Sequence, residues 1–291
     1  MPNLIVAIGF SCCYSEKMTA RKTILVSNDD GFQAEGIRAL AQALSPLANV
    51  IVVAPQSNQS AVSHAISLKR PLRLSQQPPL FSDAGPIEVY SVDGTPSDSV
   101  YMAINHVLKH RPIDLIVSGI NHGGNLGDDV FYSGTVSAAR EGILLGVPAI
   151  AISLVANHAY NFQPACAFVK SFCAQLLANA LPAGVLLNVN VPKIITKKEL
   201  AITALGRHDY TREVERRVDP RGEEYFWIGG QWNGYRDLSG TDCKAIAEGY
   251  ISVTPLNLNL TNDAMLPWLS TLQVQDYACA DLYQKAENIS R

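Results

Sequence analysis

The stretch Ile24-Leu-Val-Ser-Asn-Asp-Asp-Gly31 decides the fold class, because it reads as a buried strand that ends in two adjacent carboxylates. Its first three residues are apolar without alternation, as is typical of a strand covered by helices on both faces. The last four favour turns, so we expect the strand to stop there. The charges of Asp29 and Asp30 repel unless water, a cation or donors separate them. The pattern predicts either a polar turn that caps the next helix or a metal site.

The overall composition is that of a compact globular protein. The chain of 291 residues is long enough to form one large domain or two ordinary ones. Its residues are 47% hydrophobic and 17% charged, which is enough apolar material for a substantial core. A net charge of −3 provides no basic field for a nucleic-acid polymer and no polybasic membrane patch. The composition therefore favours a small molecule or a second copy of the chain as the partner.

The cysteines and the N-terminal segment both favour a cytoplasmic protein. Six cysteines occur without a CxxC pair or a zinc-type Cys/His cluster, as is typical of reduced, mostly buried thiols. The apolar run from Leu4 to Phe10 lacks a basic start and is too short to span a bilayer, so we expect neither a signal peptide nor an anchor. Residues 1–20, which precede Arg21-Lys22, are predicted to be an extension outside the folded core.

Strands and helices alternate along most of the chain, which predicts an open, doubly wound, mostly parallel α/β sheet. The predicted strands are 24–26, 50–54, 87–92, 114–118, 147–154, 185–191 and 251–254, and the predicted helices are 37–47, 97–108, 136–145, 164–181 and 276–285. Residues 61–86 are predicted to form an excursion in the form of a hairpin. Within the charged and aromatic segment 207–240, the strand Tyr225-Phe-Trp-Ile228 carries more apolar surface than an isolated hairpin can bury. We expect it to pack on a neighbouring subunit.

Polar residues follow three of the predicted parallel strands. In such a sheet, ligands bind beyond the carboxyl ends of the strands, near the point where the strand order reverses. The three endings are Asn28 to Asp30, Gln56 to Ser60 and Ser118 to Asn125. They offer carboxylates, hydroxyls and amides but no thiolate, and this donor set favours Mg²⁺, Mn²⁺ or a similar cation over zinc.

The segment Ser133-Gly-Thr135 is expected at a helix N-terminus, where free N–H groups and the helix dipole favour an anion. A cation beside an anion site indicates phosphoryl chemistry, because the metal would neutralise phosphate charge and lower the pKa of water. The same residues also fit an ordinary helix cap. Because no GxGxxG motif follows a strand, a dinucleotide site has little support.

Four further polar residues have two interpretations each. His64 and His122 could be general bases, but each taken alone fits a structural or surface histidine better. Asp128 and Asp129 could contact a metal or form a solvated turn.

These motifs closely resemble those of the survival protein SurE family. The resemblance extends from about Lys22 to Thr261, and the matching segments are Ile24–Gly31, Ala54–Ser60, Gly94-Thr-Pro96, Ser118–Asp129, Tyr132–Val136, Asp219-Pro-Arg-Gly222, Trp227-Ile228, Gly240-Thr-Asp242 and Glu248–Pro255. It implies a Rossmann-like α/β core over residues 21–200. It also implies a smaller C-terminal portion over 201–291, with an extended hairpin exchanged between the subunits of a homodimer or homotetramer.

The resemblance further implies a cytoplasmic, metal-dependent phosphohydrolase of nucleoside 5′-monophosphates with 3′-nucleotidase and exopolyphosphatase activity. One divalent cation is expected per subunit. Carried onto this sequence, the metal ligands are Asp29, Asp30, Ser60 and Asn121, with the two aspartates as the catalytic residues. The phosphate-binding residues are Asn125, Ser133, Gly134 and Thr135.

The sequence departs from the family pattern at a few positions. Ala61 follows Ser60 where many members have glycine, which would stiffen the metal loop; Glu35 replaces a common proline and Asn259 a common aspartate. None of these changes removes an expected ligand.

Two alternative functions use the same residues. The aspartyl-phosphate route of haloacid dehalogenase-like phosphatases needs a second aspartate two positions after the nucleophile. With Asp29 as the nucleophile, that position is Gly31, which cannot serve. A non-catalytic regulator that binds a nucleotide or a metal in the same site is the other alternative.

Overall fold

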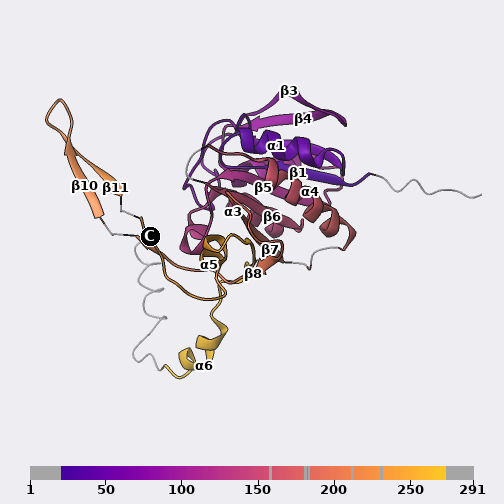
Figure 1. The fold of residues 1–291 in the computed structure, drawn as a ribbon. Coiled ribbons are helices and arrows are strands. Elements are labelled where there is room, and N and C mark those ends of the chain that lie inside the picture. Colours follow the sequence, from indigo (N-terminus) through magenta and orange to yellow (C-terminus); the bar gives the residue numbers. More distant parts are fainter. Residues whose placement is uncertain are drawn as a thin grey trace, which may run out of the picture. The chain divides into compact units, whose positions relative to one another are not determined.

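The computed structural model describes residues 21–156, 159–179, 182, 184–210, 213–229 and 232–272 (Figure 1). The predicted extension at 1–20 and the predicted helix at 276–285 lie outside these residues. The chain divides into two units, Met1–Leu256 and Asn257–Arg291. In the second unit, the described residues include a 3₁₀ turn, η3 (Asp263–Met265), and a short helix, α6 (Leu266–Leu269).

Within the described residues of the first unit, nine strands form one sheet in the order β3-β4-β2-β1-β5-β6-β7-β13-β8 (Figure 1). The strands are β1 (Thr23–Ser27), β2 (Asn49–Pro55), β3 (Leu74–Ser82), β4 (Gly85–Val92), β5 (Leu115–His122), β6 (Ala149–Val155), β7 (Val185–Pro192), β8 (Leu200–Ile202) and β13 (Ile251–Asn257). The pairs β1–β2, β1–β5, β2–β4, β5–β6, β6–β7 and β8–β13 are parallel. The antiparallel pair β3–β4 is a hairpin whose first strand lies in the predicted excursion 61–86, whereas its second strand is the one predicted separately at 87–92. The mostly parallel sheet is therefore confirmed.

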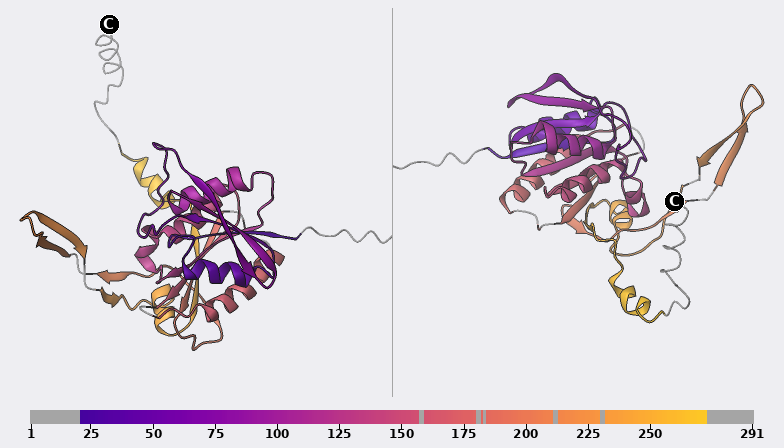
Figure 2. Two further views of the ribbon diagram at one scale, coloured as in Figure 1. Left: turned by 90° about the horizontal axis from the view of Figure 1, so that it is seen from above. Right: turned by 180° about the vertical axis from the view of Figure 1, so that it is seen from behind.

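Helices cover both faces of this sheet, as Figure 2 shows from above. The helical elements of the first unit are α1 (Glu35–Leu44), α2 (Pro96–Met102), the π-helical turn η1 (Ala103–Val107), the 3₁₀ turn η2 (Gly127–Phe131), α3 (Gly134–Leu144), α4 (Gln163–Ala178) and α5 (Asp242–Ala247). Helix α1 packs beside α4, and α2 packs beside α3. The doubly wound arrangement is confirmed, and it explains why β1 is apolar without alternation.

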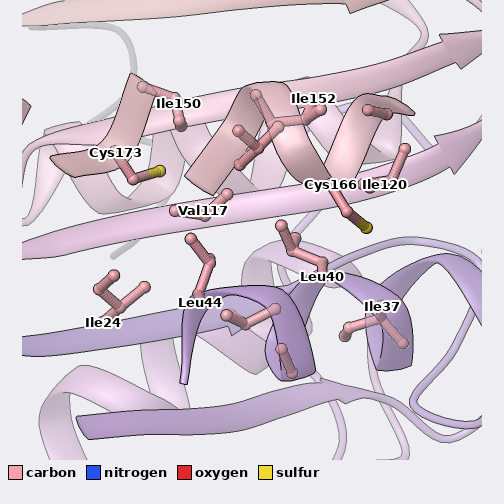
Figure 3. Packing of buried hydrophobic residues seen from close by; sticks show 14 of the residues in the cluster. Ile24, Ile37, Leu40, Leu44, Val117, Ile120, Ile150, Ile152, Cys166 and Cys173 are labelled. Carbon is pink, nitrogen blue, oxygen red and sulfur yellow. The ribbon is translucent and has the colours of Figure 1, made fainter. Parts of the chain in front are cut away.

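The core between the sheet and the α1–α4 layer follows from the spacing of apolar residues (Figure 3). Ile37, Leu40 and Leu44 recur three or four residues apart on α1 and are fully buried. Each such side chain contributes roughly 1.5–3 kcal/mol when it leaves water. From α4, Cys166 and Cys173 enter the same cluster. Burial raises the thiol pKa of Cys166 to about 11 and of Cys173 to about 12, so both remain protonated, as the sequence predicts for buried, reduced thiols.

Strand β5 is longer than the sequence predicts. We expected it to end at Ser118, but it continues to His122, with a shift of its register against β6 between Ser118 and Asn121. Gly119 makes this possible, because a Cβ there would lie 2.3 Å from the Ile152 carbonyl oxygen. Asn121 therefore lies on a strand instead of in a loop.

A separate hairpin contains the apolar strand predicted from the sequence. Strand β10 (Glu213–Val218) pairs antiparallel with β11 (Glu224–Gly229), and β9 (His208–Tyr210) pairs with β12 (Trp232–Tyr235). Every residue of β10 and β11 is exposed in the single chain. Among the residues that the structure describes, no helix is long and apolar enough to cross a membrane.

Candidate functional site

The strand order reverses at β1 and β5. Strand β1 pairs with β2 on one side and with β5 on the other. The chain continues from β1 into α1 and from β5 towards α3, and these helices belong to opposite layers. The carboxyl ends of β1 and β5 therefore flank the switch point where α/β proteins of this kind bind ligands.

Asn28 closes the turn that follows β1. Its buried amide nitrogen donates to the Gly31 carbonyl at 2.9 Å, and the Gly31 N–H donates to its amide oxygen at 3.2 Å. Gly31 has φ +98°, a conformation that glycine adopts without strain. The cap of α1 is Ala34, which makes no side-chain capping bond. The interpretation of the two carboxylates as caps of the next helix is therefore wrong, and they are available for another role.

Asp29 is buried against the N-terminus of α3. It is 4% exposed, and its Oδ1 accepts a hydrogen bond from the Thr135 hydroxyl. A Cβ on Gly134 would lie 2.6 Å from the Asp29 Cβ, so only glycine allows the helix to approach this closely. Burial raises the pKa of Asp29 to about 6; the hydrogen bond from Thr135 opposes this shift and the charge of Asp30 adds to it.

Asp30 is held by the ends of two other strands. Its Oδ2 accepts the backbone N–H of His122 at 3.2 Å and lies 2.8 Å from the ring Nδ1. Its Oδ1 lies 3.4 Å from the amide nitrogen of Asn58, in the loop after β2. The hydrogen bond to Asp30 raises the pKa of His122. The His122 ring also packs edge-on against Tyr160 and Phe162, with centroid distances of 4.8 and 5.0 Å.

The loop after β2 brings Ser60 to the same place. The Asn58 amide oxygen accepts the Ser60 hydroxyl at 2.6 Å and the Ser60 N–H at 2.8 Å, so Asn58 connects Ser60 to Asp30. The Gln59 N–H donates to the Asp29 carbonyl at 2.7 Å. The three polar endings predicted from the sequence are therefore joined by hydrogen bonds.

Asn121 adjoins His122 at the end of β5. Its amide nitrogen donates to the Gly123 carbonyl at 2.9 Å, so its amide oxygen is the atom left for a ligand. This is the donor expected of an amide that binds a hard cation.

The residues expected to bind phosphate differ in their surroundings. Ser133 caps α3, because its Oγ accepts the Val136 N–H at 3.0 Å. Asn125 belongs to a buried network at the ends of β6 and β7: its N–H donates to Asn190 and its amide nitrogen donates to Ser153. The helix-cap interpretation of Ser133 is confirmed, and it is compatible with an anion at the other free N–H groups of the helix.

The structure also gives the surroundings of the four polar residues with two interpretations, of which Asp128 is exposed. His122 binds Asp30, whereas His64 Nε2 lies 2.8 Å from Glu141 Oε2 on α3. Asp129 Oδ2 lies 3.5 Å from Nδ1 of His208 on β9. The sequence pattern does not indicate that Asn58 links Asp30 to Ser60, although Asn58 lies in the predicted polar ending Gln56 to Ser60.

The donor set fits a hard divalent cation. No group of three or more His, Cys, Asp or Glu side chains that could hold a metal occurs in the part of the chain that the structure describes. The expected ligands Asp29, Asp30, Ser60 and Asn121 are instead two carboxylates, a hydroxyl and an amide, all oxygen donors as Mg²⁺ and Mn²⁺ prefer. Asp29 is buried beside the second carboxylate of Asp30, and a bound cation would supply positive charge to this pair.

Fold and site define a doubly wound α/β protein with an acidic turn beside a helix N-terminus. A family model described as survival protein SurE matches residues 24–212. The chain is 50% identical over 258 residues to 5′-nucleotidase SurE of Myxococcus xanthus, covering 88% of this chain and 95% of that protein. It is 48% identical over 252 residues to 5′-nucleotidase SurE of Geobacter sulfurreducens, covering 85% and 92%. The chain therefore belongs to the SurE family.

The fold agrees with a solved structure of the same family. The crystal structure of the SurE protein from Aquifex aeolicus matches with a TM-score of 0.72 and 36% sequence identity, covering 85% of this chain and 98% of that one.

Proposed function

We propose that this protein is a metal-dependent phosphomonoesterase that hydrolyses nucleoside 5′-monophosphates. The relatives named above are called 5′-nucleotidases, which supports a nucleotidase function. The observation that carries the proposal is the packing of Asp29 on Gly134 and Thr135. It puts a carboxylate that suits a cation in direct contact with a helix N-terminus that suits a phosphate.

Each part of the site has a role in this reaction. Asp29, Asp30, Ser60 and Asn121 would hold one Mg²⁺ or Mn²⁺ ion. When bound, such an ion supplies charge neutralisation for the phosphate and lowers the pKa of a water that attacks phosphorus. His122 and Asn58 orient Asp30 through their hydrogen bonds. Asn125, Ser133, Gly134 and Thr135 bind the phosphate, with the free N–H groups of α3 directed at its charge.

We extend the proposal to nucleoside 3′-monophosphates and short polyphosphate. Both present the same terminal phosphate to the site. A nucleic-acid polymer and a membrane are not expected partners, because the net charge is −3. The expected location is the cytoplasm.

The β10–β11 hairpin is the proposed contact between subunits of a homodimer or homotetramer. In the antiparallel pairing, Val214 faces Ile228 and Arg216 faces Phe226, so these side chains share one face of the hairpin. Ile228 is 95% exposed in the single chain. An apolar face of this kind is typical of a surface that a partner covers.

A panel of nucleotides tests the function. Purified protein is assayed with AMP, 3′-AMP and short polyphosphate, first with EDTA and then with excess Mn²⁺ or Mg²⁺. We expect AMP turnover that EDTA abolishes and added metal restores. Nucleotide binding without turnover under every metal condition would favour the non-catalytic regulator. A phosphorylated enzyme trapped by rapid quench would instead favour the aspartyl-phosphate route.

A further inference from the structure

We propose that Ser63 and His64 are positioning residues, which hold the Ser60 loop against α3 so that the cation ligand and the phosphate site form one rigid unit. This inference rests on the proposed function, since it concerns the same cation and phosphate. The loop in question, residues 58–67, is called the Ser60 loop below.

The Ser60 loop has a backbone conformation that needs support. Ala61 and Ser63 both have φ +57°, in the left-handed region that residues with a Cβ rarely adopt. Such conformations are strained and persist only where surrounding contacts enforce them. The contacts of the next residues along the chain are therefore expected to fix the position of Ser60.

Ser63 ties the loop to the backbone just before α3. Its hydroxyl donates to the Phe131 carbonyl at 2.7 Å, and its N–H donates to the Tyr132 carbonyl at 3.0 Å. Tyr132 directly precedes Ser133, the cap of α3. A shift of the Ser60 loop would therefore displace Phe131 and Tyr132, the residues that lead into the phosphate site at the N-terminus of α3.

His64 ties the loop to the body of α3. Its Nε2 lies 2.8 Å from Glu141 Oε2, and the two side chains are only 22% and 10% exposed. The carboxylate accepts the hydrogen bond and the ring donates it. A mostly buried carboxylate that loses such a donor carries a desolvation penalty, so the contact resists displacement.

The far end of the loop is anchored to α2, which packs beside α3. The Thr95 hydroxyl donates to the Ala65 carbonyl at 2.7 Å, and the Ser67 N–H donates to Asp98 Oδ1 at 2.8 Å. These contacts give a role to the Gly94-Thr-Pro96 motif, which the reaction itself does not use. Together with Asn58, they leave Ser60 fixed between the sheet edge and the α2–α3 layer.

A matched pair of serine variants tests the inference. Ser63→Ala removes the hydroxyl bonded to Phe131, whereas Ser67→Ala makes the same change in the same loop at a hydroxyl that bonds to none of the described residues. Each is compared with wild type for direct Mn²⁺ binding by calorimetry, for kcat and KM with AMP, and for Tm. We expect Ser63→Ala to weaken Mn²⁺ binding about tenfold, the lower end of the effect of losing a residue that supports a metal ligand. The KM for AMP should rise, kcat at saturating Mn²⁺ should change much less, and Ser67→Ala should match wild type.

A purely structural role for Ser63 predicts a different result. The Tm would then fall while the Mn²⁺ dissociation constant stayed equal in both variants, and this would overturn the inference. If wild-type protein neither binds Mn²⁺ nor hydrolyses AMP, the proposed function fails and the inference fails with it. If wild type does both and the two variants agree with it, the inference alone fails.

His64 provides a second test that holds even if Ser63→Ala does not fold. His64→Ala should weaken Mn²⁺ binding in the same direction. His64→Gln keeps an amide that can donate to Glu141, so it should recover much of the affinity. Equal Mn²⁺ affinities in wild type, His64→Ala and His64→Gln would overturn the inference.

Discussion

Gly134→Ala perturbs the contact on which the proposed function depends. An alanine Cβ there would lie 2.6 Å from the Asp29 Cβ and 2.9 Å from its Oδ2, where ordinary contacts begin at 3.4 Å. Asp29 or the start of α3 must therefore move by roughly 1 Å, a misplacement that can reduce turnover about 10²-fold. Overpacking costs about 1–3 kcal/mol of stability. Because Gly134 is the first residue of α3, the better helix propensity of alanine offsets less than the helix-interior value of about 1 kcal/mol.

Activity should thus fall far more than stability in Gly134→Ala. The assay is AMP hydrolysis at saturating Mn²⁺, with the free energy of unfolding measured in urea. Gly142→Ala is the control, because it makes the same change on the same helix. Its Cβ would be 2.4 Å from Cδ1 of Ile116, the flexible end of a side chain remote from Asp29. A Gly134→Ala protein that retains more than about half of the wild-type turnover would refute the reasoning.

Three further predictions concern the pKa of Asp29, the Ser60 loop and the hairpin. Burial raises the pKa of Asp29 from 3.8 to about 6, so the metal-free folded state holds a proton that the unfolded state releases. The free energy of unfolding of the metal-free protein should therefore fall as the pH rises from 3.8 to about 6. Asp29→Asn should flatten this pH dependence in urea unfolding with EDTA present, and an unchanged slope would contradict the raised pKa of Asp29. Ala61→Gly should raise the free energy of unfolding by about 0.5–1 kcal/mol, because Ala61 has φ +57°, and a destabilised variant in thermal melts would contradict this. Phe226→Ser with Ile228→Ser should lower the mass found by light scattering at micromolar concentration, whereas a wild-type monomer would rule out the proposed interface.

The buried strands were predictable because they are short apolar runs between turn residues. The apolar run Ile24 to Val26 predicts a strand covered on both faces, and the polar residues after it are then expected at the carboxyl edge of a parallel sheet. The structure adds that Gly31 has a positive φ and that Asn28 closes the turn. These features follow from residue types with strong local preferences.

Contacts between distant segments were less accessible from the sequence. The close approach of Gly134 to Asp29 depends on how α3 packs against the sheet, which no local pattern encodes. The same holds for His122, whose bond to Asp30 requires β5 to continue past the predicted end. At Ala61 the sequence did indicate an unusual backbone conformation, because many SurE-family members have glycine at that position. The positive φ of Ala61 explains that preference for glycine.

The most direct test of the account is Mn²⁺ binding and AMP turnover measured together on wild type, Asp29→Asn, Asp30→Asn and Asp128→Asn. Asp128→Asn is the control, since it makes the same chemical change at an exposed carboxylate. We expect wild type and the control to bind one Mn²⁺ per chain and to hydrolyse AMP. The other two variants should bind Mn²⁺ weakly and lose turnover by roughly 10²-fold or more. Folded Asp29→Asn and Asp30→Asn proteins that bind Mn²⁺ and hydrolyse AMP as wild type does would contradict the assignment of this site.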